Sequence, residues 1–393
     1  MSTLKVDAIR HNSATSDAIT THSDGTASAK IIDVGGAQLS NRNKVHNGSF
    51  LINQRGGSFT STGNEYMMDR FEHVQSGSFT FDTTTTQDAS GPVGFRKCLK
   101  ITPDSTQTPT GGMNAMIQHK IEGQDLQDLC FGTSSAKKIT VSFYAKSASQ
   151  NNNHQYTLQI RKYDDSNNRN MLNRAFTVTS SWQRFTMTFD GDTAENIRND
   201  NGVGMQLLWH LADGPDDIHA QVNTFSRTTN SSFYTAVTGQ SNFMDNTNNE
   251  FYLTGIQLEV GDTATSYEHR SFAQELELCK RYFFILGKDA NGNTTQLSMP
   301  FINEAPSNLS GYINFQFHPE MRATPTATIG SELQLGKPQV GMSNHKVSSF
   351  GGLSPTGSYY FQYTNQTGST GDSNMYMRIG HHADSYARFS AEF

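Results

Sequence analysis

The feature of this sequence that most constrains its fold is a series of eight runs, between residues 79 and 260, in which apolar and polar residues alternate. A period of two residues is typical of a β-strand with one buried and one exposed face. Clusters of Gly, Asn and Asp separate the runs and predict turns. We therefore expect an all-β fold with an antiparallel β-sandwich. The runs are FTFDTTTT (79–86), KCLKIT (97–102), KKITVSFYAKS (137–147), QYTLQIRKY (155–163), RAFTVTS (174–180), WQRFTMTF (182–189), VGMQLLWHL (203–211) and EFYLTGIQLEV (250–260).

Helical spacing occurs in two places. Residues 271–283 carry apolar side chains at i, i+4, i+7 and i+11, which predicts a short connecting helix. One or two helical turns are also expected within residues 121–130. After residue 284, short apolar runs return between turn sequences and predict a second small β-domain. The expected domains are an N-terminal arm (1–46), a β-sandwich (47–270), a linking helix (271–284) and a C-terminal β-sandwich or barrel (285–393).

Residues 1–46 differ from the rest of the chain. They are poor in aromatic residues and alternate short apolar pairs with polar residues, so they cannot bury a core of their own. We expect very short strands, with turns at Gly25 and Gly35, that become ordered against other chains or a particle surface. A disordered tail is the alternative.

Composition excludes several classes of protein. Only 17% of the residues are charged, fewer than disordered chains usually carry, and 25 Phe supply apolar surface for thin sandwich cores. The net charge of −6 comes without a basic cluster, which argues against nucleic-acid binding. Because no apolar signal segment and no run of 18 apolar residues occurs, we expect no signal peptide, synthesis in a cytoplasm and no membrane insertion. Cys98, Cys130 and Cys279 lack metal-site spacing and are expected to be free thiols.

Catalytic motifs are missing from the sequence. No GxSxG, GxxxxGK[ST] or GxGxxG pattern occurs, and His381 and His382 lack the spacing of a zinc-binding helix. Two pairs of adjacent acids lie in loops, where neighbouring side chains point in different directions rather than facing each other as in a glycosidase. We expect no enzymatic activity and no catalytic residue. The pairs are Asp164 with Asp165 and Asp216 with Asp217.

One loop combines an aromatic residue with several polar side chains. Glycan sites use an aromatic ring that stacks on C–H groups, together with polar side chains that bind hydroxyls. The segment WHLADGPDD (209–217) has both, so we take it as the candidate glycan-binding site. Its residues are Trp209, His210, Asp213, Asp216 and Asp217. Both tryptophans, Trp182 and Trp209, also lie in alternating strands, and burial of their rings in the core is the competing interpretation.

The segment FYLTGIQLEVGDTATSYEHRSFAQELELCKRYF (251–283) resembles a stretch of bacteriophage tail-fibre and appendage proteins, in which a strand ending in QLE-G precedes an extended linker and a helix ending in C-x-RYF. NGSFLINQRG (47–56) with MDRF (68–71) is similar to the front of the same module, and HPEMRATPTATI (318–329) to the domain that follows it. The opening 20 residues resemble the arms of marine phage fibre-like proteins. The matching residues of the first segment are Gln257, Leu258, Glu259, Gly261, Thr265, Tyr267, Glu268, Arg270, Glu275, Leu276, Cys279, Arg281 and Tyr282.

The expected sandwich also resembles, more distantly, jelly-roll carbohydrate-binding modules. Asn47, Gly48 and Phe50 match their opening strand, and Glu259 falls in the closing strand. Those modules often hold a structural calcium ion near the two strands. Leu51 replaces the family's acidic residue, so calcium near Asn47 and Glu259 stays open, and no other cofactor is expected.

The resemblance implies a structural virion protein, a tail fibre or appendage. Its arm (1–46) would attach to a tail, portal or capsid protein, and its β-domains would adsorb to host-surface polysaccharide. A homotrimer is the expectation for a fibre, and SYYFQY (358–363) is a candidate for burial between chains or in a core. The alternatives are a head decoration or tail knob without receptor binding and, less favoured, a secreted polysaccharide-degrading enzyme or its binding module.

Overall fold

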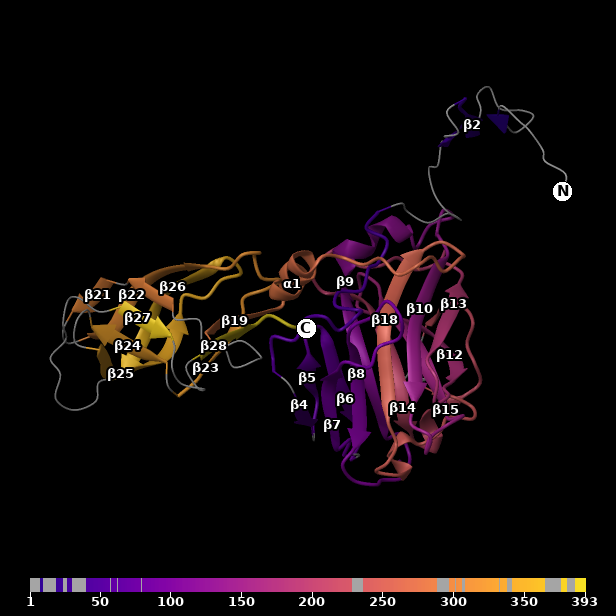
Figure 1. Ribbon diagram of the computed structural model, residues 1–393, viewed down its shortest axis with the longest axis horizontal. Helices are drawn as coiled ribbons and strands as arrows, with labels where there is room; N and C mark the ends of the chain where they lie inside the picture. The colour runs from indigo at the N-terminus through magenta and orange to yellow at the C-terminus, as the bar shows by residue number, and fades with distance from the viewer. Residues whose placement is uncertain are drawn as a thin grey trace.

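The computed structural model confirms the all-β prediction (Figure 1). Within the residues that it describes, the chain forms twenty-eight strands, one α-helix and three short 3-10 helices, and every strand pair but one is antiparallel. No helix in this part of the chain has the length and apolar character needed to cross a bilayer. The structure describes residues 8–9, 19–23, 27–29, 40–56, 58–61, 63–78, 80–227, 236–287, 297–300, 302–305, 308–331, 333–337, 341–364, 376–379 and 386–393.

Two sheets form the N-terminal sandwich. The six-stranded sheet has the order β13 (Gln183–Phe189), β10 (Ile139–Ser147), β18 (Phe251–Val260), β8 (Cys98–Pro103), β7 (Thr83–Asp88) and β4 (Ser58–Ser61). The seven-stranded sheet has the order β16 (Ser226–Arg227), β12 (Arg169–Thr177), β11 (Gln155–Tyr163), β14 (Val203–Asp213), β9 (Asn114–Glu122), β6 (Phe71–Ser76) and β5 (Glu65–Met68). Neighbours in the order are often distant in sequence, so the sheets bring together residues from many parts of the chain.

The sandwich core follows the period-two pattern. On β10, Val141 and Phe143 are fully buried between the sheets, whereas Tyr144 and Lys146 point to the outer face and are half-buried. Aromatic rings lie among the aliphatic side chains of the core, and several of them pack edge to face, as Phe143 does on Phe176 with ring centroids 5.1 Å apart.

The sandwich begins earlier in the chain than the sequence indicated. The Asn43 side chain donates to the Ile256 carbonyl (3.0 Å), the Lys44 amide donates to Leu258 (2.9 Å), and Val45 is fully buried in the sandwich core. Residues 43–46 therefore belong to the sandwich, which corrects the boundary at residue 46. Of the preceding residues, three short strands pair with one another: β1 (Ala8–Ile9), β2 (Ile19–Thr21) and β3 (Ala27–Ala29). Gly25 and Gly35 lie outside the described residues.

Both expected helical segments are present. The 3-10 helix η1 (Gly123–Leu129) follows β9, and α1 (Phe272–Lys280) connects the sandwich to the C-terminal part. A capping box, in which Ser271 and Gln274 bond each other's backbone amides, starts α1 at its first turn. The buried face of α1 includes Cys279, and the three cysteines are free.

A second hydrophobic core organises the C-terminal part. Phe317, Phe361 and Phe389 are buried in it. Within SYYFQY, Phe361 and Tyr363 face this core, whereas Tyr359 is 59% exposed. His381 and His382 lie outside the described residues. One sheet has the order β19 (Phe283–Gly287), β28 (Tyr386–Ser390), β23 (Thr326–Ile329), and the other β20 (Leu297–Pro300), β27 (Tyr376–Ile379), β24 (Gln334–Lys337), β25 (Gly341–Gly351), β26 (Gly357–Thr364), β22 (Asn308–Gln316), β21 (Ile302–Ala305).

Two buried carboxylates join the two parts. Glu122, at the end of β9, accepts hydrogen bonds from Arg281 Nε (2.7 Å) and from the Tyr282 hydroxyl (2.6 Å). Burial alone would raise the pKa of Glu122, but these hydrogen bonds hold it below its ordinary value. Arg281 and Tyr282 belong to the CKRYF motif, so that part of the motif connects the sandwich to the C-terminal sheets.

Glu392 is the second carboxylate. It pairs with the fully buried Arg70 (2.5 Å) and with Arg55 (3.0 Å), both from the sandwich. The Arg70 guanidinium also lies 3.3 Å from the centroid of the Tyr282 ring, a cation–π geometry. The last residues of the chain are thereby held against the sandwich.

A buried histidine should make the sandwich less stable in acid. Burial lowers the pKa of His73 to about 4, against about 6.5 in an unfolded chain. Between these values only the unfolded state binds the proton, so stability should fall as the pH is lowered, by about 3 kcal/mol in total from this group. Urea unfolding at pH 7 and pH 4.5 measures the effect. In His73→Gln, the free energy of unfolding should decrease less between the two pH values than in the wild type. Some decrease should persist, because burial also lowers the pKa values of His46 and His119. Equal decreases in the two proteins would contradict the role of His73.

Candidate functional site

The structure places Trp209 in the core, and not in a surface loop. Its side chain is 0% exposed, on the inner face of β14, and its ring meets that of Phe143 edge to face at 5.7 Å. A sugar cannot stack on this ring in the folded protein. The interpretation of Trp209 as a surface binding residue is therefore wrong, because its strand turns this side chain inward.

His210 and Asp213 are also withdrawn from solvent. His210 Nδ1 and Asp213 Oδ1 are 2.9 Å apart, and both side chains are fully buried. His210 points to the outer face of the seven-stranded sheet, where the segment around Gln240 covers it: Gln240 donates to the His210 carbonyl (2.9 Å) and accepts from Thr157 (2.8 Å). The two side chains pair with each other beneath this segment and do not face solvent.

Asp216 and Asp217 lie on the short 3-10 helix η2 (Pro215–Asp217) and have different surroundings. Asp216 is exposed, whereas Asp217 is half-buried and accepts a hydrogen bond from the Asn114 side chain (2.8 Å). Burial, reinforced by the charge of Asp213, raises the pKa of Asp217. Among the five residues of the expected site, it is Asp217 that lines a cavity in the described part of the chain.

That cavity is a groove of about 320 Å³ on the outer face of the seven-stranded sheet, which we call the sheet groove. It crosses adjacent strands because their outward side chains align in register: Gln118 of β9 lies opposite Glu72 of β6 on one side and Leu208 of β14 on the other. The lining residues are Val74, Ser76, Gly112, Asn114, Met116, Gln118, Arg161, Arg169, Leu208 and Asp217.

The sheet groove combines an apolar floor with fixed polar groups. Leu208 is fully buried and Met116 is 4% exposed, so hydrocarbon forms the base. Gln118 donates to Glu72 (2.5 Å), which leaves its carbonyl oxygen as an acceptor. The Arg161 guanidinium is oriented by the Gln159 carbonyl (2.9 Å). Such a surface suits a ligand that presents C–H faces and hydroxyl groups together.

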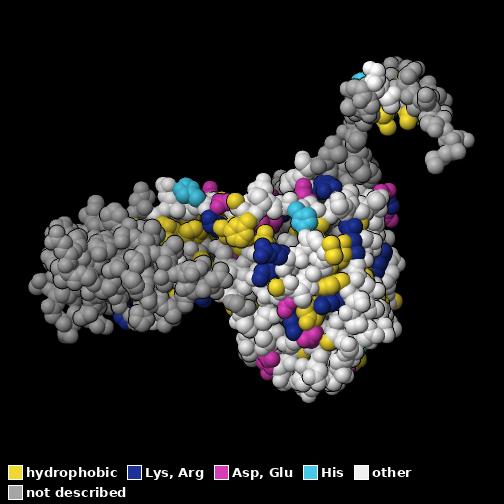
Figure 2. All heavy atoms as spheres, in the orientation of Figure 1, with side chains coloured by type: hydrophobic (Ala, Val, Ile, Leu, Met, Phe, Trp, Pro, Cys, Tyr) yellow, Lys and Arg dark blue, Asp and Glu magenta, His cyan; other side chains and the backbone are white. Residues whose placement is uncertain are grey.

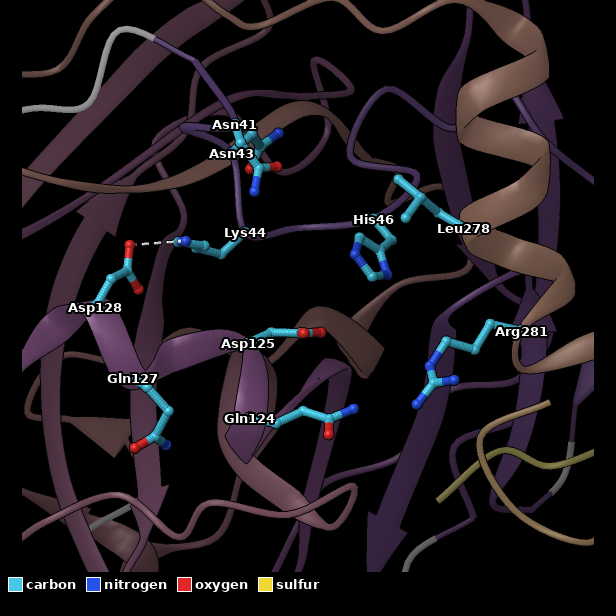
Figure 3. Close-up of a pocket in the computed structure, with 10 residues that line it drawn as sticks. All are labelled: Asn41, Asn43, Lys44, His46, Gln124, Asp125, Gln127, Asp128, Leu278 and Arg281. Atoms are coloured by element: carbon cyan, nitrogen blue, oxygen red, sulfur yellow. Dashed lines mark ion pairs between the residues drawn. The ribbon is translucent and has the colours of Figure 1, made fainter. Parts of the chain in front are cut away.

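A larger cavity, of about 640 Å³, lies at the end of the sandwich (Figure 3). We call it the end pocket. Residues 41–46, η1 and the last turn of α1 surround it, and the Lys44 ammonium pairs with Asp128 (2.8 Å) while Arg281 pairs with Glu122. Asp125 points between these groups in Figure 3, and burial, with the charge of Glu122, raises the pKa of its carboxyl. Most of the charged side chains around the end pocket are already paired within the protein. We therefore assign no ligand to the end pocket, although it is the larger of the two cavities.

Asn47 and Glu259, the two residues considered for calcium, form hydrogen bonds with different parts of the protein. Asn47 accepts from the Ile52 amide (2.9 Å) and donates to the Ile52 carbonyl (2.8 Å). Glu259 accepts from Gln257 (2.8 Å) and from the Thr265 hydroxyl (2.6 Å). In the part of the chain that the structure describes, no three His, Cys, Asp or Glu side chains are grouped to hold a metal ion. Calcium near Asn47 and Glu259 was left open by the sequence and stays open.

Sequence reasoning missed the sheet groove because its residues come from five strands and the loops beside them. Alternation shows which residues of a strand share a face, but it shows which face points outward only when the position of one of those residues in the fold is known. The two amides that line the groove, Asn114 and Gln118, lie on β9 (Asn114–Glu122), which is not among the alternating runs, and the local pattern does not reveal which strands are neighbours.

No family model matches this chain, and no curated protein matches it. Among solved structures, it is similar to the enzymatically active domain of tailspike protein 4 from bacteriophage CBA120, with 12% identity and a TM-score of 0.30, covering 56% of this chain and 21% of that domain. It is also similar to a family 11 carbohydrate-binding module from Clostridium thermocellum (10% identity, TM-score 0.27, 55% of this chain and 99% of the module). A family 22 module from the same organism matches at 9% identity and a TM-score of 0.28, over 59% and 99%. At these TM-scores the similarities assign neither a family nor a ligand.

Proposed function

We propose that this chain is a non-catalytic display protein of a phage particle, and that its sheet groove binds a glycan of the host surface. The observation that carries the proposal is the groove itself, in which amide, guanidinium and carboxylate groups are held in place over an apolar floor. Amide side chains both donate and accept hydrogen bonds, as sugar hydroxyls do. Leu208 and Met116 offer apolar contact to the C–H groups of a pyranose ring.

The groove has no aromatic ring among its described lining residues, so one site should bind weakly. Weak sites suffice when several copies are attached to one particle, because the first contact raises the effective concentration for the next. Display on a virion, as a homotrimer or in several appendages, would provide those copies.

Attachment to the particle is the second part of the proposal. Asn43 and Lys44 are held along β18 by side-chain and backbone hydrogen bonds, so force on the preceding arm would be transmitted directly to the sandwich. We assign attachment to a tail, portal or capsid protein to the arm. Immunogold labelling of purified particles with an antibody against this chain should mark their surface; particles that lack the chain would contradict the virion role.

A glycan array probed with the multivalent protein tests the groove. Asn114→Ala and Gln118→Ala should each weaken binding about threefold to tenfold, since each removes a hydrogen-bonding amide worth about 0.5–1.5 kcal/mol. After Gln118→Ala, Glu72 keeps its ion pair with Lys120 (2.7 Å), so the fold should be unaffected.

Gln127→Ala is the matched control, because it removes an exposed amide that lines the end pocket. It should leave glycan binding unchanged. Equal losses in the control and the groove variants would contradict the site. Absence of binding to any glycan would favour a decoration or knob without a receptor, and release of oligosaccharide would contradict the non-catalytic role.

A further inference from the structure

The outer face of the six-stranded sheet carries a cluster of aromatic and cationic residues that the proposed function does not use. Cross-strand register places it: Tyr252 of β18 lies opposite Lys146 of β10 on one side and opposite Lys100 of β8 on the other. In the next row, Tyr144 lies opposite Arg184 of β13. We call this cluster the outer face, and it includes Trp182, just before β13.

Two cations of the outer face, Lys146 and Arg184, have no acidic partner among the described residues. Lys146 Nζ lies 4.3 Å from the centroid of the Tyr252 ring and 5.3 Å from that of Trp182. Arg184 hydrogen-bonds to the Ser142 hydroxyl (3.2 Å) and to the Thr265 carbonyl. Across the part of the chain that the structure describes, neither side chain forms an ion pair, whereas Lys100 is paired with Glu250 (2.6 Å). Both charges are therefore available to an anion.

The charges of Lys146 and Arg184 are only partly offset. Neither side chain forms an ion pair among the described residues, although Asp88 is near enough to Lys146 for the two charges to interact. Figure 2 shows Lys and Arg side chains interspersed with hydrophobic ones on this side of the sandwich, over β10 and β18.

Trp182 provides a ring that a ligand can reach. It is half-buried, its Nε1 donates to the Ser90 carbonyl (2.9 Å), and its ring meets Tyr252 edge to face at 6.1 Å. The backbone hydrogen bond fixes the orientation of the indole. A fixed, partly exposed indole beside an unpaired ammonium favours a ligand with both an apolar ring face and a negative charge.

We propose that the outer face is a second binding site, specific for acidic polysaccharides. One carboxylate or sulfate group of the polymer would bind Lys146 and another would bind Arg184, and the C–H face of a pyranose beside the first group would contact Trp182. Single-stranded nucleic acid fits less well, because it needs several open rings for successive bases, and Tyr252, the ring beside Trp182, is only 8% exposed. This site lies on the opposite sheet from the sheet groove and does not depend on it.

Titration of the full-length protein with polygalacturonate tests the proposal, with dextran as the uncharged polymer. We expect binding to polygalacturonate and none at this site to dextran, with affinity that falls as salt is raised. Lys146→Gln and Arg184→Gln should each weaken binding about fivefold or more, because each removes a charged contact that is partly shielded from water. Lys146→Arg keeps the charge and should restore most of the affinity.

Lys138→Gln is the matched control: it makes the same change of charge just before β10, but Lys138 is paired with Asp190 (2.6 Å) and its side chain is 54% exposed. It should bind like the wild type, and thermal unfolding should show that all variants fold. If Lys138→Gln weakened polygalacturonate binding as much as Lys146→Gln does, binding would depend on net charge alone, and the proposal would be overturned. So would absence of polygalacturonate binding, or tighter binding of a (dT)20 oligonucleotide. The two proposals can fail separately. Asn114→Ala and Gln118→Ala should not change polygalacturonate binding, and Lys146→Gln and Arg184→Gln should not change binding of the glycan that the sheet groove recognises.

Discussion

Replacing Trp209 with alanine should lower the free energy of unfolding of the sandwich by about 3 to 5 kcal/mol, the usual cost of removing a large aromatic side chain from a core. The ring is 0% exposed and packs on Phe143, Ala would leave a cavity, and no groove residue would be altered directly. Urea unfolding followed by circular dichroism measures the change. Glycan binding by the folded fraction should be unchanged.

Trp182→Ala makes the same substitution on the outer face. Because Trp182 is half-buried and outside the core, we expect a cost of about 1 kcal/mol. Similar costs for the two variants, or a Trp209→Ala protein of normal stability with weakened glycan binding, would show that Trp209 is a surface residue and not a core residue.

Replacing Arg70 with methionine should destabilise the protein by about 3 to 5 kcal/mol, because it leaves the buried Glu392 carboxylate with less compensation. The Glu392 side chain is 4% exposed, and Arg70 is its closer partner. The variant also loses the contact with Tyr282. Since Glu392 follows β28 of the C-terminal part, we expect the C-terminal sheets to separate from the sandwich, which small-angle scattering would detect as a longer molecule.

Arg198→Met is the control for the loss of an arginine from an ion pair, because Arg198 pairs with Asp200 at the surface, where both side chains are more exposed. Its cost should be below about 1 kcal/mol. Combining Arg70→Met with Glu392→Gln should cost less than the sum of the single changes, since the unpaired charge is removed. An additive double variant would show that the pair does not couple the two parts.

The alternating runs predicted most of the long strands of the sandwich, and helical spacing predicted α1. The predicted runs did not include β4, β5, β6, β9 and β16, which also belong to the two sheets. Val141 and Phe143 alternate with Tyr144 and Lys146 along one strand, and that local pattern already separates a buried from an exposed face. Ser271 and Gln274 mark the start of α1 in the same local way. These features depend on residues close together in sequence, so they could be predicted without knowledge of the fold.

The candidate sites could not be predicted in this way. Trp182 and Trp209 sit in similar alternating segments, and only the packing of the two sheets decides that Trp209 is buried and Trp182 is accessible. Both sites require strand neighbours that are distant in sequence. The sheet groove needs β9 beside β14, about 90 residues apart, and the outer face needs β8 beside β18, about 150 residues apart.

The sequence by itself thus determined the all-β class, the alternation within each strand and the connecting helix, because local periodicity sets which side chains of a strand share a face. Only the tertiary structure decided which faces meet in the core, how Arg281 and Tyr282 join the two parts, and which polar side chains become neighbours. Those outcomes depend on cross-strand register, and register is set by burial across the whole sandwich.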